Sequence, residues 1–229
     1  MAQAARGGKR VAPRAKRRKK GRSPLLLPGI LAVVVVLLLG VKLGLERFST
    51  AGEETREKHP APEWVTKEYL PVNPFSRPGT GLEEVNGVVV HYVGNPGTTA
   101  EQNRSFFAGL AEQTEGAENT VSASSHFLIG LDGEIIQCIP LDEWAYCTGE
   151  RNRDTISIEC CHPDDGGAFT DATYQSLLRL VRWLQEEFDL DGEQIIRHYD
   201  VTGKECPRYY VQHPEAWEQF KADLEQTGT

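Results

Sequence analysis

Six histidines and five cysteines are the side chains of this sequence best suited to binding a metal ion. His91 ends a β-branched apolar run, His126 opens a second run, and His198 directly follows a third. The other three histidines stand beside prolines in loop-like sequence: His59, His162 and His213. A histidine buried in a strand must satisfy two ring nitrogens, and a plain hydrogen bond is the usual solution. A metal site therefore has to be inferred from a group of residues.

Grouping His91 and His198 with Cys206 predicts a catalytic zinc set. Cys206 lies near the end of a polar segment that begins at His198 and contains a glycine, HYDVTGKECP, which is expected to be a loop. Two imidazoles and one thiolate give three protein ligands and leave the fourth zinc position to water, whereas structural sites use four. The sequence therefore predicts Zn²⁺ as the cofactor.

Two charged residues complete the chemistry of amide hydrolysis. Glu159 stands on an alternating strand with no adjacent cation, and Lys204 lies two positions before Cys206. Zinc lowers the pKa of its bound water toward ~7, a carboxylate can take the proton during attack, and an ammonium can stabilise the oxyanion. Glu159 is thus a candidate general base and Lys204 a candidate oxyanion stabiliser. The alternative is a solvated strand residue and an ordinary loop charge.

The elements that must position these residues alternate between strands and helices. Strands are expected over residues 87–93, 125–131, 134–139, 155–161 and 194–197. Helices are expected from Thr98 or Thr99 to Gln113, from Thr170 or Asp171 to Phe188, and from Pro214 onward. The Asp132-Gly133 pair predicts a hairpin. The fold class is therefore α/β, with a mixed central β-sheet flanked by helices.

Side-chain patterns indicate which faces of these elements are buried. In the strand over 155–161, Glu159 alternates with isoleucines and should point away from their face. In the first helix, Phe106, Phe107 and Leu110 are expected to form the apolar stripe.

The charge of the chain is strongly asymmetric. The net charge is −8, yet residues 1–22 hold ten Lys or Arg and no acid, which leaves 15 basic against 33 acidic residues. Residues 25–41 carry no charge and are almost all aliphatic, so a transmembrane helix is predicted at 24–45. The positive-inside rule places residues 1–23 in the cytoplasm as a basic tail and the rest outside.

A cleaved signal peptide is the alternative to this anchor, because small residues stand where a peptidase could cut, at Ser49, Thr50 and Ala51. The long basic region and long apolar run favour a single-pass protein of the cell membrane with an extracytoplasmic catalytic domain over a secreted one. Residues 46–68 are expected to be a linker and 69–229 the catalytic domain. The acidic composition after the tail argues against a nucleic-acid partner.

Cysteines outside the cytoplasm raise the question of disulfides. With Cys206 on zinc, the remaining four could form two bridges in three pairings, and the sequence does not choose among them: Cys138, Cys147, Cys160 and Cys161. Cys160 and Cys161 point to opposite faces of a strand and cannot readily bond to each other. We expect most of these cysteines to be buried thiols.

Four segments resemble the type-2 N-acetylmuramoyl-L-alanine amidases: VNGVVVHYVGNPG, SSHFLIGLDGEIIQCIPLDEWAY, DTISIECCHPD and IIRHYDVTGKECPRYY. The resemblance covers roughly residues 71–224, in order, and keeps the His-x7-Cys and Lys-x-Cys spacings. The family includes phage endolysins and bacterial autolysins and is similar in fold to animal peptidoglycan recognition proteins. The resemblance implies hydrolysis of the amide between N-acetylmuramic acid and L-alanine in peptidoglycan.

The resemblance also implies roles for single residues. His91, His198 and Cys206 would bind Zn²⁺, with Glu159 as general base and Lys204 as oxyanion stabiliser, in agreement with their chemistry. The substrate groove would lie near four residues in loops, for which a plain surface position is the alternative: Asn95, Trp144, Asn152 and Arg153. The expected partner is peptidoglycan, both its peptide stem and its glycan strand, bound by a monomer.

One position departs from the family pattern. Some branches carry a catalytic tyrosine just before the histidine of the hairpin strand, where this chain has Ser125. The difference argues against a tyrosine-assisted mechanism and places more of the proton transfer on Glu159. His126 itself matches a position that is often histidine in the family without being a ligand, so it is left out of the zinc set.

Two other functions remain as alternatives. A recognition module would bind the same peptide stem without cutting it, but the presence of all five catalytic residues argues against it. A different zinc hydrolase acting on anhydro-muropeptides would work inside the cell, which the basic tail and apolar run contradict.

Overall fold

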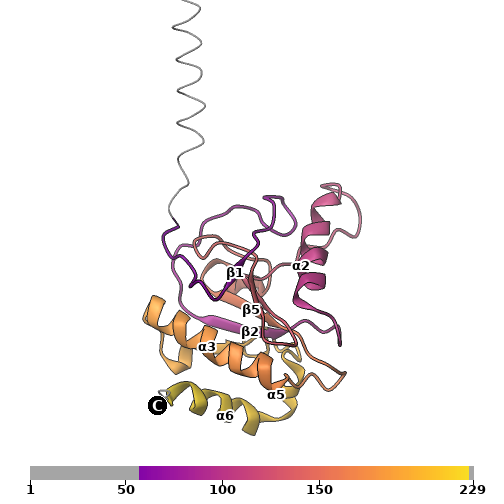
Figure 1. Cartoon of the computed structure of the whole chain (residues 1–229). Coiled ribbons are helices and arrows are strands. Elements are labelled where there is room, and N and C mark those ends of the chain that lie inside the picture. The colour runs from indigo at the N-terminus through magenta and orange to yellow at the C-terminus, as the bar shows by residue number, and fades with distance from the viewer. Residues whose placement is uncertain (1–56, 227–229) are drawn as a thin grey trace, which may run out of the picture. The chain divides into compact units, whose positions relative to one another are not determined.

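A mixed six-stranded sheet forms the centre of the fold, within residues 57–226 that the computed structural model describes (Figure 1). The strand order is β1-β4-β3-β5-β2-β6. The strands are β1 (Thr66–Lys67), β2 (Val88–Tyr92), β3 (Phe127–Ile129), β4 (Ile135–Gln137), β5 (Ile156–Cys160) and β6 (Ile195–Arg197). Strands β3 and β4 pair antiparallel, and all other neighbours pair parallel. The predicted mixed sheet is confirmed.

Helices cover both faces of this sheet. Helix α2 (Ala100–Gly109) lies on one face, while α3 (Asp171–Phe188) and α6 (Pro214–Glu225) lie side by side on the other (Figure 1). Two short helices, α4 (His198–Thr202) and α5 (Arg208–Gln212), join β6 to α6. Short 3₁₀ turns span residues 110–112, 149–153 and 192–194. The predicted α/β class and its three main helices are confirmed.

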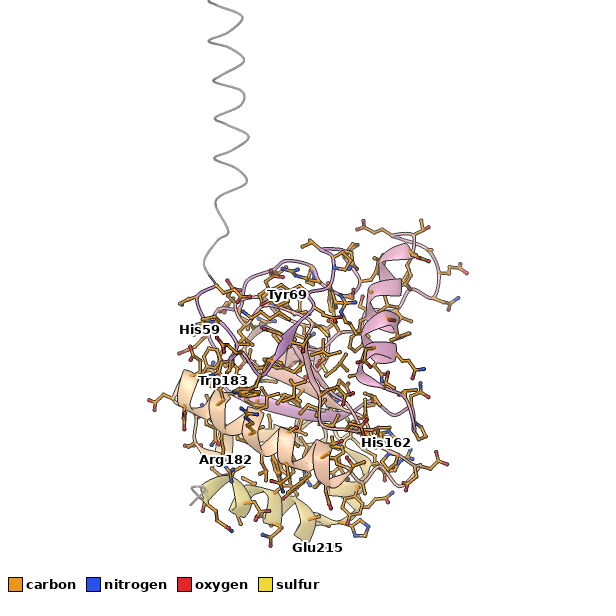
Figure 2. All side chains as sticks on the ribbon, in the orientation of Figure 1. His59, Tyr69, His162, Arg182, Trp183 and Glu215 are labelled. Carbon is orange, nitrogen blue, oxygen red and sulfur yellow. The ribbon has the colours of Figure 1, made fainter. Side chains whose placement is uncertain are left out.

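Helix α3 packs the larger core because its apolar residues recur at helical spacing. Leu177, Leu180 and Leu184 are each at most 1% exposed and pack with the inward side chains of β2, β3 and β5. Trp183, labelled on α3 in Figure 2, meets Phe127 edge to face, with 6.4 Å between the ring centroids. This geometry is the favourable one for aromatic pairs, and it fixes α3 across the sheet.

Helix α2 corrects one sequence prediction. Thr99 caps it by accepting from the Gln102 N–H, as expected. Phe107 and Leu110 are buried, but Phe106 is 56% exposed and does not belong to the apolar stripe. Adjacent helix positions point about 100° apart, so Phe106 and Phe107 cannot both face a narrow contact. The second core under α2 is correspondingly small.

The hairpin between β3 and β4 is confirmed, with a longer connection than two residues. The Gly133 N–H donates to the Gly130 carbonyl at 3.2 Å, and the Gly130 N–H donates to the Glu134 carbonyl at 2.9 Å. Gly133 has a φ of 85°, which an L side chain would adopt only with strain. The connection is thus a turn followed by a glycine bulge, a common three-residue hairpin loop.

The folded unit begins before the predicted domain start at residue 69. Thr66 and Lys67 form the edge strand β1 beside β4, and Val65 is buried in the larger core, so this part of the expected linker belongs to the fold. No helix within residues 57–226 is long and apolar enough to cross a membrane. The predicted basic tail (1–23), the predicted membrane helix (24–45) and residues 46–56 of the linker lie outside the described residues.

Candidate metal centre and active site

Three parallel strands bring the predicted zinc ligands to one edge of the sheet. His91 on β2 lies directly beside Glu159 on β5, and His198 follows β6, whose Arg197 pairs with Val90. Parallel strands end at the same edge, which is where ligands bind in open α/β sheets. The strand register thus places residues distant in sequence next to one another.

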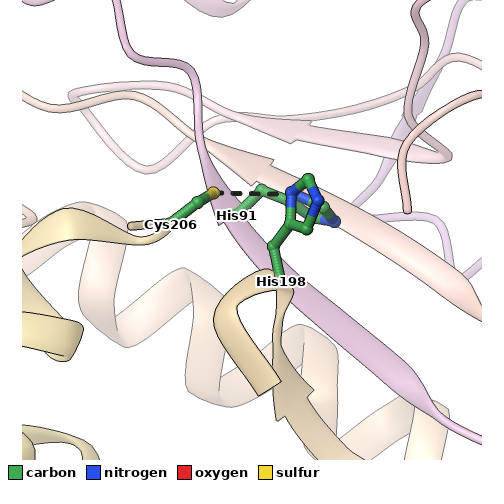
Figure 3. A group of neighbouring side chains, drawn as sticks. All are labelled: His91, His198 and Cys206. Carbon is green, nitrogen blue, oxygen red and sulfur yellow. Dashed lines mark hydrogen bonds between the residues drawn. The ribbon is translucent and has the colours of Figure 1, made fainter. Parts of the chain in front are cut away.

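His91, His198 and Cys206 converge at this edge (Figure 3). One ligand atom of each lies within 4.8 Å of those of the other two. Cys206 Sγ is 3.7 Å from His91 Nδ1, and the two imidazole centroids are 4.7 Å apart. His91 and Cys206 are buried, while His198 is half-buried. Such a pocket can close around one small cation.

Helix α4 turns the chain so that Cys206 returns to His91, and its presence corrects the predicted loop after His198. Asp200 accepts from the Arg197 N–H at 2.8 Å and pairs with its guanidinium at 2.7 Å, which starts the helix. Gly203 ends it with a φ of 75°. The Tyr199 N–H then donates to the Cys206 carbonyl at 2.9 Å and holds the returning segment.

The protonation states of these groups fit a divalent metal. Burial, the nearby His198 and Lys204 lower the pKa of His91 well below 6.5, so its ring is neutral at pH 7. Burial and the same lysine lower the pKa of His198. Burial, and then Glu159, raise the pKa of the Cys206 thiol to about 12, so a proton must leave when a cation binds. Two neutral imidazoles and one thiol match the donor set of catalytic zinc.

Glu159 is placed to handle protons beside this set. Its side chain is 17% exposed, and Oε1 lies 4.0 Å from His91 Nδ1. The Oε2 atom is buried and has no hydrogen-bond partner within the described residues. Burial raises the pKa of Glu159 to about 8, while Lys204 and a hydrogen bond from Cys147 lower it by less. A carboxyl group with a free oxygen and such a pKa can take and return a proton near neutrality.

Lys204 supplies the positive charge of the site. It is exposed and forms no ion pair within residues 57–226. Its ammonium lowers the pKa of His91, Glu159 and Cys206, which shows that its charge acts on all three. The charge is therefore free to interact with an anion formed at the metal centre.

The four residues expected near a substrate groove do not form one group. Asn95 is exposed in the turn after β2, at the metal end of the sheet. Trp144 is half-buried and packs on Tyr146 at 5.3 Å between ring centroids. Arg153 is exposed and lines a cleft of about 650 Å³ with Asn86 and Asp154.

The cleft beside Arg153 lies away from the metal end. Asn86 and Asp154 precede β2 and β5, and their backbones join at 2.7 Å at the amino ends of these strands. Asn152, the fourth predicted residue, turns inward instead of facing a groove, and its side-chain oxygen accepts from two backbone N–H groups, those of Cys147 and Thr148. Asn152 and Arg153 are adjacent in the sequence, but their side chains do not share a site.

Two residues at the site were not predicted from the sequence. Thr148 Oγ1 lies 3.1 Å from His91 Nε2, and Cys147 Sγ lies 3.2 Å from the same atom. Cys147 also forms a second possible metal group with His91 and Glu159. Both residues belong to an irregular segment, in which no periodicity indicates the direction of a side chain. The only available signal was Cys147 itself, which the sequence offered as a disulfide candidate.

The remaining polar residues near β5 are structural. His126 is fully buried, and both of its ring nitrogens are engaged, Nδ1 with Ser157 at 3.0 Å and Nε2 with the Glu143 carbonyl at 2.8 Å. The Ser125 hydroxyl donates to backbone carbonyls. The four cysteines outside the predicted zinc set are free thiols, and three of them are buried, which confirms that prediction: Cys138, Cys160 and Cys161.

Comparison with known proteins places this arrangement in a family. A family model described as N-acetylmuramoyl-L-alanine amidase matches residues 81–209, which is more than half of the chain. The amidase CwlL of Bacillus licheniformis is 33% identical over 159 residues, covering 64% of this chain and 42% of the relative. BlyA of Bacillus subtilis (strain 168) is 32% identical over 177 residues, covering 68% and 45%. The match thus spans less than half the length of these curated relatives.

Solved structures agree in fold. A mutant endolysin from Bacillus subtilis matches with a TM-score of 0.57 and 27% identity, covering 70% of this chain and 97% of that one. The structure of PlyL matches with a TM-score of 0.59 at 21% identity, covering 72% and 99%, a likeness that concerns the fold alone.

Proposed function

The chain belongs to the N-acetylmuramoyl-L-alanine amidase family, and we propose that it hydrolyses the amide between N-acetylmuramic acid and L-alanine in peptidoglycan with the help of Zn²⁺. The observation that carries this proposal is the convergence of His91, His198 and Cys206 within 4.8 Å, beside a glutamate with a free buried oxygen. A binding module would have no use for a proton acceptor in that position.

His91, His198 and Cys206 would hold the zinc ion. Bound there, zinc supplies a Lewis acid and lowers the pKa of a coordinated water. A bound cation also adds positive charge beside Glu159 and favours its carboxylate form over the neutral form. The same charge lowers the pKa of Cys206 and retains the thiolate.

Glu159 carries the proton through the reaction. It accepts a proton as the oxygen of water adds to the lactyl carbonyl carbon, and it returns that proton to the alanine nitrogen as the carbon–nitrogen bond breaks. The products are a muramic carboxylate and a peptide with a free N-terminal alanine. The Ser125 hydroxyl is engaged with backbone carbonyls, so Glu159 has no competing side chain at that position.

Lys204 would stabilise the negative charge that develops on the carbonyl oxygen. Its ammonium has no carboxylate partner within the described residues, so nothing neutralises it before substrate binds. Gly203 ends α4 just before it and fixes where the side chain starts. A cation placed beside the developing oxyanion would stabilise the transition state more than the ground state.

Incubation of the zinc-loaded full chain with purified peptidoglycan tests the proposal. The expected result is new N-terminal alanine, lost with a chelator and restored by added zinc, and absent with Glu159→Gln. Binding to peptidoglycan without new alanine ends would instead identify a recognition module. Cleavage that continues at the wild-type rate in Glu159→Gln would rule out the assigned base.

We also propose that the catalytic domain works outside the cytoplasm as a monomer tethered by residues 24–45. The uncharged run after ten basic residues supports this orientation. Detection of the intact N-terminus in washed membranes, together with protease access to the domain from outside, would support the tether. A soluble protein lacking residues 1–50 would support secretion after cleavage, and light scattering reports the oligomeric state.

A further inference from the structure

The side chain of Asn152 fixes the loop that touches the far side of His91. Its Oδ1 accepts from the Cys147 N–H at 3.0 Å and from the Thr148 N–H at 2.6 Å. One acceptor thus holds two consecutive backbone donors, which leaves the loop little freedom at these positions. Because residues 138–155 include no strand or α-helix, this contact substitutes for regular structure.

Thr148 is directed by this loop onto His91. Its hydroxyl oxygen lies 3.1 Å from Nε2, and both side chains are only 1% exposed. Water therefore cannot readily replace either partner, and an unpaired Nε2–H would be costly. On the opposite side of the ring, Nδ1 faces Cys206 Sγ at 3.7 Å and Glu159 Oε1 at 4.0 Å.

The two sides of the ring have different tasks because a neutral imidazole carries one proton. A nitrogen that binds a metal must offer its lone pair, so the proton has to be on the other nitrogen. The Nδ1 atom of His91 faces the other proposed ligands, so the proton is assigned to Nε2. Thr148 Oγ1 then accepts a hydrogen bond from Nε2–H. Contacts of this kind set the tautomer and the orientation of metal-binding histidines.

We propose that Thr148 and Asn152 are positioning residues that hold His91 with its Nδ1 lone pair toward the metal set. The proposal rests on the proposed function in that it takes the cation at His91, His198 and Cys206 to be zinc. It also gives Asn152 a different role from the predicted substrate contact, because Asn152 would support the metal ligand His91 from its Nε2 side.

Cys147 is the competing partner for the same nitrogen. Its sulfur lies 3.2 Å from Nε2, but it is also 3.8 Å from Glu159 Oε1, to which its S–H can donate. Thiol sulfur is a weak acceptor compared with a hydroxyl oxygen. Thr148 should therefore contribute more than Cys147 to holding the Nε2 proton.

Zinc affinity and the histidine tautomer test the proposal in the full chain. Thr148→Val removes the acceptor at nearly constant volume, and it should raise the zinc Kd by ~10–100-fold in competition with a chelator. In metal-free protein labelled with ¹⁵N-histidine, the proton of His91 should lie on Nε2 in the wild type and move toward Nδ1 in the variant. Thr148→Ser, which keeps the hydroxyl, should restore both readouts.

A matched control separates this effect from a general loss of stability. Thr173 is fully buried on α3, and its hydroxyl donates to the Gly130 carbonyl at 2.8 Å, away from the metal centre. Thr173→Val makes the same chemical change and should leave the zinc Kd and the His91 nitrogen shifts unaltered. Cys147→Ala should weaken zinc binding less than Thr148→Val does.

Asn152 provides an independent second pair of variants if Thr148→Val does not fold. Asn152→Asp retains an oxygen for both N–H groups and should keep zinc affinity, whereas Asn152→Ala should lose it. Equal zinc affinity in all Thr148 and Asn152 variants, with the tautomer unchanged, would overturn the inference while leaving the proposed function intact. A wild-type chain that binds no zinc would overturn the proposed function as well.

Discussion

His91 and His126 flank the same strand, β5, and both are almost completely buried, yet their surroundings differ in kind. His126 has a protein partner at each ring nitrogen, Ser157 and the Glu143 carbonyl. The Nε2 atom of His91 contacts Thr148 Oγ1 at 3.1 Å, while Nδ1 faces the Cys206 thiol at 3.7 Å. Burial alone therefore does not distinguish a structural histidine from a ligand. The kind of partner at the second nitrogen does: it is a backbone carbonyl for His126 and a thiol that can bind a metal for His91.

The difference extends to the charges around each histidine. Lys204 lowers the pKa of His91 and of Glu159, and Glu159 Oε2 has no hydrogen-bond partner within the described residues. Around His126 both ring nitrogens are hydrogen-bonded, and burial and Glu143 are the causes of its pKa shift. One region is arranged for stability, and the other leaves groups free for a cation and an anion.

Removing a ligand should have the largest effect on this comparison. Cys206→Ser is expected to abolish bound zinc and measurable amidase activity, because a hydroxyl does not replace a thiolate toward zinc. His126→Gln, its counterpart in the structural region, should keep one zinc per chain. Metal analysis of the two purified variants checks both expectations. A folded His126→Gln variant without zinc would contradict the assignment of His126 to the structural region.

Glu159→Gln should have the next largest effect. The amide cannot take a proton, so kcat should fall ~10²–10⁴-fold, the range for a lost general base, with zinc retained. Release of N-terminal alanine from peptidoglycan measures the rate. Zinc lost together with activity would mean that Glu159 binds the metal and does not act as the base.

His126 should contribute to a loss of stability in acid. Burial lowers its pKa to about 4, while an unfolded histidine titrates near ~6.5. Between these values the unfolded state binds more protons, so the free energy of unfolding falls as pH falls, by up to ~1.4 kcal/mol per pH unit. His126→Gln loses hydrogen bonds and should be less stable at pH 7.5.

The pH dependence of that difference separates His126 from other groups. The stability advantage of the wild type over His126→Gln should shrink from pH 6.5 to pH 4. Urea unfolding of the metal-free proteins at each pH measures this difference in stability. His91 changes stability in the same direction, but it is present in both proteins, so its contribution cancels. A difference that does not vary with pH would show that His126 is not held neutral by the fold.

Lys204→Ala should have the smallest effect of the four. The ammonium is exposed and partly screened, so the loss in kcat should lie near the lower end of the ~10²–10³ range for an oxyanion donor. Lys204→Arg keeps the charge and should recover part of the rate. An alanine variant with the wild-type rate would remove Lys204 from the mechanism.

Much of the fold was predictable because it rests on periodic patterns. The β-branched run over 87–93 and the helical spacing of Leu177, Val181 and Leu184 predicted β2 and α3 nearly to their ends. Strand β1 was not predictable, since it has only two residues in a segment rich in proline and charge. Its position depends on pairing with β4 and on burial of Val65, both of which are tertiary effects.

The residues of the candidate site also differ in whether a sequence pattern could predict them. His91, Glu159, His198 and Cys206 could be assigned because residue type and spacing restrict them strongly. The loop behind His91 could not, because the side-chain hydrogen bonds of Asn152 and Thr148 leave no pattern in the sequence. The family resemblance placed both Asn152 and Arg153 in loops near the substrate groove, yet the 3₁₀ turn directs the two side chains to different places.

The proposed ligands come from two places that are far apart in the chain, His91 on β2 and the segment from His198 to Cys206. A cation held by both would act as a reversible cross-link that closes the intervening stretch into a ring. Closing a long ring restricts the unfolded chain, and an ion that binds only the folded form shifts the equilibrium further by mass action. Metal supply would then govern the lifetime of the protein against proteolysis as well as its rate of turnover.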